Sequence, residues 1–277
     1  MKGGMTQVGG FRSIVRSIKL AGYFVRFGSE LFVTQPQTRV DRAAWLHRFS
    51  RTALEGLGLE LTVEGVFPTR GAVISNHLSY IDIVVFAALS PCVFCSKAEI
   101  EKVPVLGWMT TMAGTIYVER GRGGSALKAR SEMQAAAESG LPVVFFPEGT
   151  TTNGRKLLPF HSGLLAQAMN VGEPVTAVFL RYTIDQDNGP EIRAENDMCW
   201  WGKRSMWAHI FRFLGLKGAH ATVRFAAEPI RFSSDLLHRK DAANEARKAM
   251  LLLSGLAEIA QDADQKKLEL ADLDLRG

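Results

Sequence analysis

The chain has 277 residues, with 33 lysine and arginine residues against 28 aspartate and glutamate residues, and a formal net charge of +5 at pH 7. This length fits one large α/β domain or a smaller domain with an extension, and the mixed composition excludes a disordered or low-complexity chain. The small basic excess suits an anionic membrane or an acidic substrate, but no basic-aromatic stripe or known nucleic-acid-binding motif occurs, so we expect no nucleic-acid partner.

Residues 1–50 predict a helical N-terminal segment that is both amphipathic and basic. A helix over residues 11–33 places five apolar side chains on one side and four basic ones on a neighbouring stripe: Phe11, Ile14, Val15, Ile18 and Val25, then Arg12, Arg16, Lys19 and Arg26. Such a helix either lies in a membrane interface or packs on its own domain. No run of 18 apolar residues occurs, so we expect no transmembrane helix.

Residues 51–277 predict one catalytic-sized domain without internal repeats or a long linker. Strand-like stretches occur at 59–64, 71–75, 92–96, 115–119, 142–146, 175–182 and 221–226, and helix-like segments separate many of them. The clearest helix covers residues 125–139, with Ser125 as N-cap, and the last covers about 241–260. This alternation predicts an α/β fold with a mixed, largely parallel central sheet flanked by helices.

Three polar clusters each follow an apolar strand: "NHLSYID" at 76–82, "GTIYVERG" at 114–121 and "FPEGTTTNG" at 146–154. In open α/β sheets, the loops after the strands converge on ligand sites. We therefore expect His77, Asp82, Arg120, Glu148 and Gly149 to share one site. Cys92 and Cys95 form a CxxC pair, but no second pair follows, so we interpret them as buried strand residues and predict no metal.

His77 and Asp82 lie between apolar segments, where an unpaired ionisable side chain is costly. We predict that they are partners, with the carboxylate fixing the imidazole tautomer and leaving the other ring nitrogen as a general base. Such a pair activates a hydroxyl group. Because the chain has no G-x-S-x-G motif, the hydroxyl is predicted to belong to a substrate. Activation of water by a hydrolase or thioesterase is the alternative.

Four stretches, in order and spacing, resemble the motifs of the glycerolipid acyltransferases: "NHLSYID", "GTIYVER", "FPEGTTTNG" and "EPVTAVFL". The segment "SKAEIEKVPVLGW" at 96–108 adds to a resemblance that covers about residues 60–230 and is nearest to the 1-acylglycerol-3-phosphate (lysophosphatidic acid) acyltransferases. The resemblance implies transfer of an acyl chain from acyl-CoA or acyl carrier protein to the free hydroxyl of a lysophospholipid, foremost 1-acylglycerol-3-phosphate, whose acylation gives phosphatidic acid. It implies no cofactor and an enzyme at the cytoplasmic face of a membrane, peripheral or monotopic.

The resemblance also implies residue roles. His77 would be the base, Asp82 would orient it, and Glu148 would align the acceptor or order the site. The implied acceptor-binding residues are Asn76, Arg120, Glu148, Gly149, Thr150, Thr151 and Arg155.

Two positions depart from the family pattern, and one of them is His161, which stands where a lysine is common. Thr151 stands where an arginine is common, and Arg155 or Lys156 would have to supply that charge. A larger or zwitterionic acceptor, such as lyso-ornithine lipid or lysophosphatidylcholine, is therefore an alternative to a phosphate head group.

Residues 199–218 combine three tryptophans with basic residues in a helix-like segment. This composition is typical of a membrane headgroup zone, and burial in the core is the other interpretation. A non-catalytic membrane lipid-binding protein is the alternative function of another class.

Overall fold

The computed structural model describes residues 9–102, 106–119, 123–232 and 239–255. A seven-stranded sheet crosses the described part of the chain in the order β1-β7-β6-β2-β5-β3-β4. The strands are β1 (Leu59–Glu64), β2 (Ala72–Ser75), β3 (Val93–Lys97), β4 (Ile116–Val118), β5 (Val143–Phe145), β6 (Val175–Ile184) and β7 (Ala219–Phe225). The strands pair in parallel, except for the antiparallel pair of β6 and β7. The predicted mixed, largely parallel sheet is confirmed.

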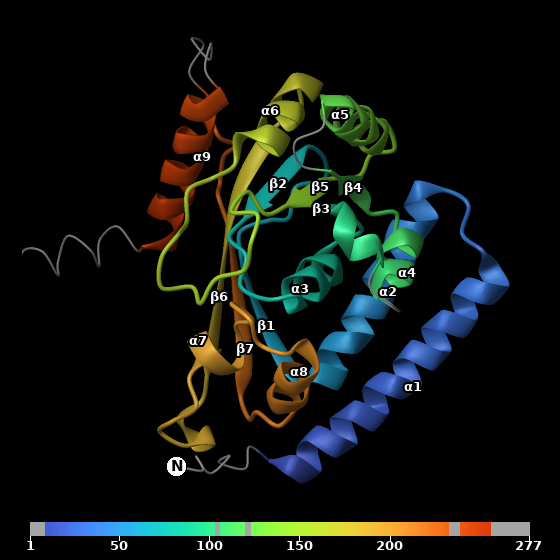
Figure 1. The fold of residues 1–277 in the computed structure, drawn as a ribbon, viewed down its shortest axis with the longest axis vertical. Coiled ribbons are helices and arrows are strands. Elements are labelled where there is room, and N and C mark those ends of the chain that lie inside the picture. The colour runs from blue at the N-terminus through green and yellow to red at the C-terminus, as the bar shows by residue number, and fades with distance from the viewer. Residues whose placement is uncertain (1–8, 103–105, 120–122, 233–238, 256–277) are drawn as a thin grey trace, which may run out of the picture.

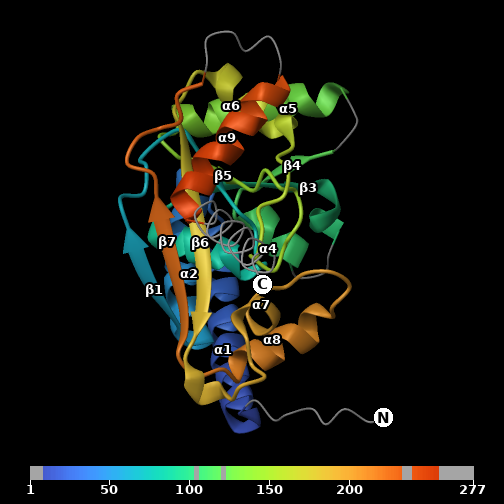
Figure 2. The same cartoon turned by 90° about the vertical axis from the view of Figure 1, so that its left-hand side faces the viewer.

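Helices cover both faces of this sheet (Figures 1 and 2). They are α1 (Gly10–Thr34), α2 (Arg39–Leu57), α3 (Ile81–Leu89), α4 (Leu106–Met112), α5 (Gly123–Glu138), α6 (Ser162–Val171), α7 (Ala194–Asp197), α8 (Met206–Leu214) and α9 (Arg239–Ser254). Within the described ranges, no helix combines the length and apolar character needed to span a bilayer.

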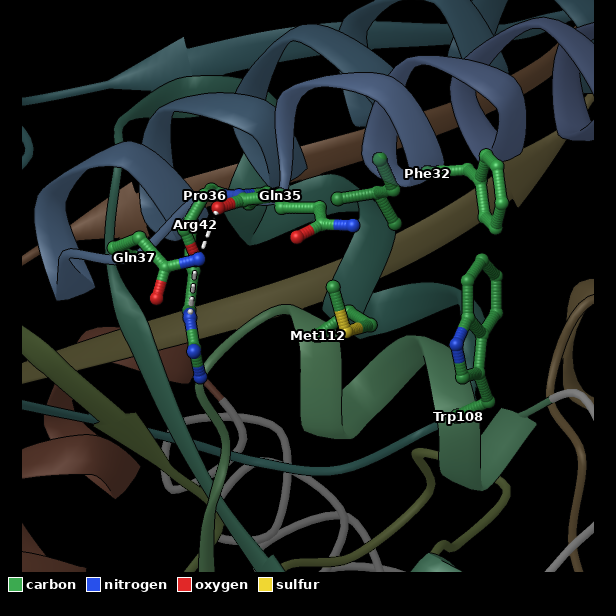
Figure 3. Close-up of a pocket in the computed structure, with 8 residues that line it drawn as sticks. Phe32, Gln35, Pro36, Gln37, Arg42, Trp108 and Met112 are labelled. Carbon is green, nitrogen blue, oxygen red and sulfur yellow. Dashed lines mark hydrogen bonds between the residues drawn. The ribbon is translucent and has the colours of Figure 1, made fainter.

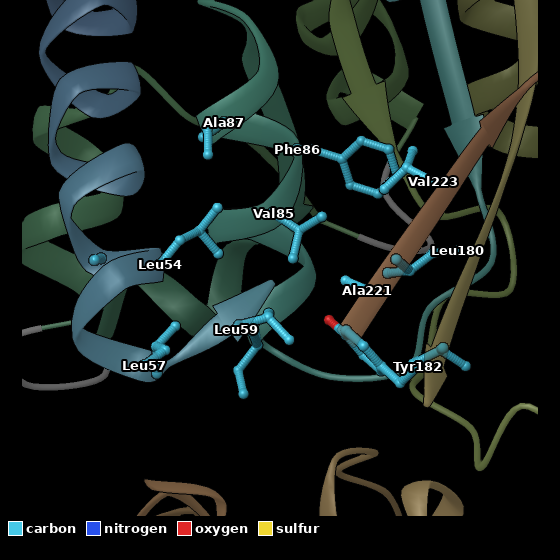
Figure 4. Close-up of a cluster of buried hydrophobic side chains, with 14 of the residues drawn as sticks. Leu54, Leu57, Leu59, Val85, Phe86, Ala87, Leu180, Tyr182, Ala221 and Val223 are labelled. Carbon is cyan, nitrogen blue, oxygen red and sulfur yellow. The ribbon is translucent and has the colours of Figure 1, made fainter. Parts of the chain in front are cut away.

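The sheet separates two apolar clusters, and β6 contributes to both. Leu180 and Tyr182 pack with residues of α2 and α3 on one face (Figure 4), whereas Ala177 and Phe179 pack with α5, α6 and α9 on the other. Successive side chains of a strand point to opposite faces, so a central strand covered on both sides is apolar throughout. This is why Thr176 is the one polar side chain of β6 between Val175 and Leu180.

The N-terminal helices are part of this core. Thr38 caps α2 by accepting a hydrogen bond from the Asp41 backbone N–H at 3.1 Å, and Gly58 ends the helix in a left-handed conformation. Trp45 of α2 stacks on Phe49 and donates its indole N–H to the Phe27 carbonyl of α1 at 3.2 Å. The boundary expected near residue 50, between the N-terminal segment and the catalytic domain, falls inside α2. Side chains of α2 that come before and after this position belong to the same apolar cluster against the sheet.

Helix α1 has two apolar faces. Phe27 and Leu31 are buried against α2, while the predicted apolar side, with Phe11 at 83%, Ile18 at 67% and Val25 at 70% exposed, faces outward. The predicted basic stripe differs from expectation, because Arg12 and Arg16 donate to backbone carbonyls at the end of α8. The helix therefore packs on its own domain and still presents an apolar surface.

Three of the predicted helices begin or end at other residues than expected. Helix α5 begins at Gly123, before the expected Ser125, and α9 ends at Ser254, where Gly255 follows with a φ of 67°. Residues 256–260, expected to be helical, lie outside the described residues. In the tryptophan-rich segment only α8 is helical, because Ser205 caps it by accepting from the Ala208 N–H and Gly215 follows its last residue.

Candidate active site

His77 and Asp82 meet in the loop between the carboxyl end of β2 and the first turn of α3. The His77 Nδ1 and the Asp82 Oδ2 are 2.8 Å apart. Asp82 is fully buried, whereas the His77 side chain is 20% exposed. The structure thus joins the two residues that the sequence predicted to be partners.

Backbone groups of the same loop hold the Asp82 carboxylate in place. The N–H groups of Leu78 and Ser79 donate to Oδ2 at 2.7 Å and 3.0 Å. An ionised carboxylate can only accept hydrogen bonds, so the proton between the two side chains belongs to Nδ1 of His77. The remaining ring nitrogen, Nε2, then carries a lone pair, as a general base requires.

Tyr182, at the end of β6, completes the environment of Asp82. Its phenol donates to the Asp82 Oδ1 at 2.7 Å from a fully buried position. Burial, together with the negative charge of Asp82, raises the pKa of Tyr182, so the phenol keeps its proton and remains a donor. The sequence pattern gave no sign of a role for Tyr182. It lies 100 positions from Asp82 in the chain, and its place in an apolar strand is typical of a core residue.

Phe146, just after β5, fixes the plane of the imidazole. Its ring stacks on that of His77 with centroids 4.0 Å apart and an interplanar angle of 11°. The flat contact leaves the edge of the imidazole, where its nitrogens lie, as the reactive side. This residue belongs to "FPEGTTTNG", but the pattern alone gave it no role beyond that of an apolar strand end.

Glu148 ties this loop to the next one. Its two carboxylate oxygens accept from the backbone N–H groups of His77 at 3.0 Å and Leu158 at 2.9 Å, and the side chain is 2% exposed. Burial raises the pKa of Glu148, and the two backbone hydrogen bonds oppose that rise. Of the two roles considered for Glu148, this geometry favours ordering the site over contact with the acceptor.

Asn76 has a different environment from the one expected. Its amide donates to the Leu180 carbonyl at 2.9 Å and accepts from the Leu180 N–H at 2.8 Å, and the residue is buried. The side chain thus extends the hydrogen bonding of β2 to β6 by one residue. It thereby anchors the residue that precedes His77 to β6.

The loop after Glu148 also contacts the backbone of His77. Gly149 has a φ of 64°, a conformation that favours glycine, and the Thr152 N–H donates to the His77 carbonyl at 2.8 Å. Thr150 is exposed and Thr151 is half-buried. Arg155 is exposed, and its Nε lies 3.8 Å from Glu195 of α7.

Two expectations concern residues that do not enter this geometry. Arg120 lies outside the described residues. Cys92 and Cys95 are buried in the core, and burial raises the pKa of both thiols, in agreement with a structural role. Within the described ranges, no three His, Cys, Asp or Glu side chains are arranged to hold a metal ion.

A cavity of about 320 Å³ lies away from His77, where the turn between α1 and α2 meets α4 (Figure 3). Phe32, Trp108 and Met112 supply apolar walls, and the Arg42 guanidinium, held by the Pro36 carbonyl at 3.0 Å, lines the polar end. None of its lining residues belongs to the loops that surround His77. It is a separate feature of the N-terminal hairpin.

The fold and the site together indicate the class of reaction that the protein can catalyse. A His–Asp pair after a strand of a largely parallel sheet suits general-base activation of a hydroxyl. The comparisons with known proteins agree with this class: a sequence model of the family described as Acyltransferase matches residues 60–181.

Individual relatives extend the match over most of the chain. A lyso-ornithine lipid O-acyltransferase of Pseudomonas aeruginosa is 34% identical over 79% of this chain and 80% of its own length. A 1-acyl-sn-glycerol-3-phosphate acyltransferase of Neisseria gonorrhoeae is 30% identical over 83% and 85%. The crystal structure of PlsC, the 1-acyl-sn-glycerophosphate acyltransferase of Thermotoga maritima, shares the fold with a TM-score of 0.61 at 19% identity, over 88% of this chain and 95% of that one. The chain belongs to the acyltransferase family, and the predicted resemblance is confirmed.

Proposed function

We propose that this acyltransferase moves an acyl chain from a thioester, carried by coenzyme A or acyl carrier protein, to the free hydroxyl of a membrane lysolipid. His77 acts as the general base. The hydrogen bond between the His77 Nδ1 and the fully buried Asp82 carries this proposal, because it directs the lone pair of the imidazole to the exposed side.

The proposed reaction needs one proton transfer out and one back. Nε2 of His77 takes the proton of the acceptor hydroxyl while that oxygen attacks the thioester carbonyl. The C–S bond then breaks, the ester remains on the lipid, and the imidazolium returns the proton to the departing thiolate. These reaction steps need no protein nucleophile, cofactor or metal.

Asp82 and its partners stabilise the imidazolium that forms in this step. Positioned general-base catalysis contributes about a hundred- to ten-thousandfold. Orientation of two large substrates supplies a further part of the acceleration, which reaches about 7–11 kcal/mol in well-oriented systems.

For the acceptor we propose a lyso-ornithine lipid. Thr151 replaces the arginine that a phosphate head group would engage, and Arg155, four residues later in the same loop, lies 3.8 Å from the carboxylate of Glu195. A cation and an anion together suit the carboxylate and amine of a zwitterionic ornithine head group. The relative from Pseudomonas aeruginosa, named as a lyso-ornithine lipid O-acyltransferase, supports this choice.

The second candidate acceptor is 1-acylglycerol-3-phosphate. The relative from Neisseria gonorrhoeae, named as a 1-acyl-sn-glycerol-3-phosphate acyltransferase, favours it. In that case Arg155 would leave Glu195 for the phosphate, since the ion pair is exposed and such pairs are weak.

We further propose that α1 holds the enzyme on the cytoplasmic face of a membrane, where acyl thioesters are available. Its outward apolar side, with Phe11, Ile18 and Val25, supports this, as does the exposed basic side chain of Lys19. Deletion of the whole helix would expose the core partners of Phe27 and Leu31. The test is therefore Phe11→Ser with Ile18→Ser, which should weaken sedimentation with anionic vesicles without lowering thermal stability.

A panel of acceptors crossed with both donors tests the reaction. Lyso-ornithine lipid, 1-acylglycerol-3-phosphate and lysophosphatidylcholine would each be offered with acyl-CoA and acyl carrier protein, and products would be separated by mass. We expect the highest kcat/KM with lyso-ornithine lipid. Mostly free fatty acid would favour a hydrolase, and no turnover with any pair would favour a non-catalytic lipid-binding protein.

A further inference from the structure

Helix α8 exposes two aromatic side chains one turn apart. Trp207 is 71% and Phe211 is 48% exposed, while His209 and Phe213 on the opposite face are buried. Residues four apart lie on the same side of a helix, so the two rings form one apolar surface. Exposed basic residues flank it, with Lys203 and Arg204 before the helix and Lys217 after it.

Two arginines of α1 fix the position of α8. Arg12 donates to the Gly215 carbonyl at 2.7 Å, and Arg16 donates to the carbonyls of Leu214 and Leu216 at 3.1 Å and 2.8 Å. The last carbonyls of a helix lack partners within it and carry partial negative charge, so guanidinium groups are well suited to cap them. The two helices lie side by side at one end of the molecule in both views (Figures 1 and 2).

The opposite side of α8 contacts the loop that carries His77. The Tyr80 phenol and the His209 Nδ1 are hydrogen bonded at 2.9 Å, and in the segment before α8 the backbone N–H of Trp200 donates to the Leu78 carbonyl at 2.8 Å. The Tyr80 and Trp200 rings also meet edge to face, with centroids 5.7 Å apart. The inward side of α8 is therefore hydrogen bonded directly to the loop that carries His77, while its outward side carries Trp207 and Phe211.

We propose that Trp207 and Phe211 form a second lipid-docking surface, which seats the loop of His77 at the membrane beside α1. This inference rests on the proposed function, since it brings the base to where a lysolipid lies. A bilayer is the occupant that the composition favours. Tryptophan and basic side chains together suit the headgroup zone, and the exposed lysines and arginine complement anionic lipids.

The test compares Trp207→Ser/Phe211→Ser with a control that removes equally exposed apolar side chains elsewhere. Leu127→Ser/Leu252→Ser is that control, because Leu127 on α5 is 70% and Leu252 on α9 is 72% exposed. Binding to vesicles of phosphatidylcholine and phosphatidylglycerol would be measured by flotation. The α8 variant should lose about tenfold or more in affinity, and the control should bind like the wild type.

Two further measurements separate the possible outcomes. Brominated lipids should quench the fluorescence that Trp207→Phe removes, and turnover of a short-chain, monomeric lysolipid should stay unchanged in the α8 variant. Equal vesicle affinity of the α8 variant and the control would overturn the proposal. Unchanged vesicle affinity with loss of turnover only when acyl carrier protein is the donor would overturn it too, in favour of a protein-binding face.

The flotation assay does not depend on catalysis. If the wild type turns over no acceptor but the α8 variant still loses vesicle affinity, docking stands and the proposed function fails. If turnover on vesicles is normal while affinity is unchanged by the substitutions, the function stands and docking by α8 fails.

Discussion

The loop between β2 and α3 and the outer edge formed by α1 and α8 are built on opposite principles. In the loop, Asp82 is fully buried and accepts four hydrogen bonds. Two come from backbone N–H groups of the same loop, and two come from the side chains of His77 and Tyr182. At the edge, large apolar side chains such as Phe11 and Trp207 face outward. A buried charge needs full pairing, whereas an exposed apolar side chain gains free energy only when something covers it.

The difference indicates where each kind of substitution should act. Changes in the loop should lower kcat, because they disturb the geometry of the base. Changes at the edge should lower affinity for membranes and leave the chemistry of a dissolved acceptor unaltered.

Asp82→Asn is expected to have the largest effect on rate among substitutions that support His77. An amide no longer dictates which ring nitrogen carries the proton and does not stabilise the imidazolium, so kcat should fall about a hundred- to a thousandfold, within the range expected for loss of the base itself. Steady-state kinetics on lysolipid vesicles would measure the loss. Asp185→Asn, at an exposed carboxylate near His220, is the control. Equal kcat for the Asp82 variant and the wild type would refute a role for the pair.

Tyr182→Phe should have a smaller effect on rate. Loss of the phenol leaves the Asp82 Oδ1 without that donor, which costs about 1–3 kcal/mol of stability, and we expect a several-fold to tenfold lower kcat. The loss should fall on kcat and leave KM for both substrates unchanged, because Tyr182 contacts Asp82 and acts through it. A stability loss without any change in kcat would reduce Tyr182 to a core residue.

Arg16→Ala tests the edge. The substitution removes two hydrogen bonds to the carbonyl end of α8 and should lower the free energy of unfolding by about 1–2 kcal/mol. Denaturant titration measures this, with Lys19→Ala, an exposed residue of the same helix, as control. The kcat on a monomeric acceptor should stay at the wild-type value. A drop in that kcat would show that the edge and the loop are not separable.

His209 lies at the junction of the two regions and should make the stability of the protein depend on acid pH. Burial, and next the positive charge of Arg204, lowers its pKa to about 4 from an ordinary value of 6.5. The unfolded chain therefore binds the proton more readily, and stability that is complete above pH 6.5 is lost as the pH falls toward 4, by up to about 3 kcal/mol. Denaturation of the wild type and His209→Gln at pH 7 and pH 4.5 measures this. Parallel losses in both proteins would contradict it.

The apolar strands were predictable because a sheet covered on both faces requires them, and β1 to β7 each lie within three residues of the predicted ends. The pairing of His77 with Asp82 was predictable because the two residues lie five positions apart between apolar segments, where an unpaired ionisable side chain is costly. Their support was not predictable. Tyr182 and Asn76 reach their partners only through the sheet order, which places β6 beside β2.

Helix α1 shows a second limit of sequence patterns. The apolar side with Phe11, Ile18 and Val25 is evident from spacing, but Leu20, Tyr23 and Phe27 form another apolar side, and this one packs inward. A helix with two apolar sides does not reveal which one is buried. Likewise, Arg12 and Arg16 matched a solvated basic stripe, and only the fold brings them to α8.

The central claim is that the imidazole of His77 removes the proton of a lipid hydroxyl. Its most direct test is acyl transfer by His77→Ala, with His220→Ala as control, and folding checked by thermal denaturation. We predict a loss of about a hundred- to ten-thousandfold in kcat, unchanged vesicle binding, and partial recovery of the rate when free imidazole is added. Acyl transfer by His77→Ala at the rate of the wild type would contradict the account.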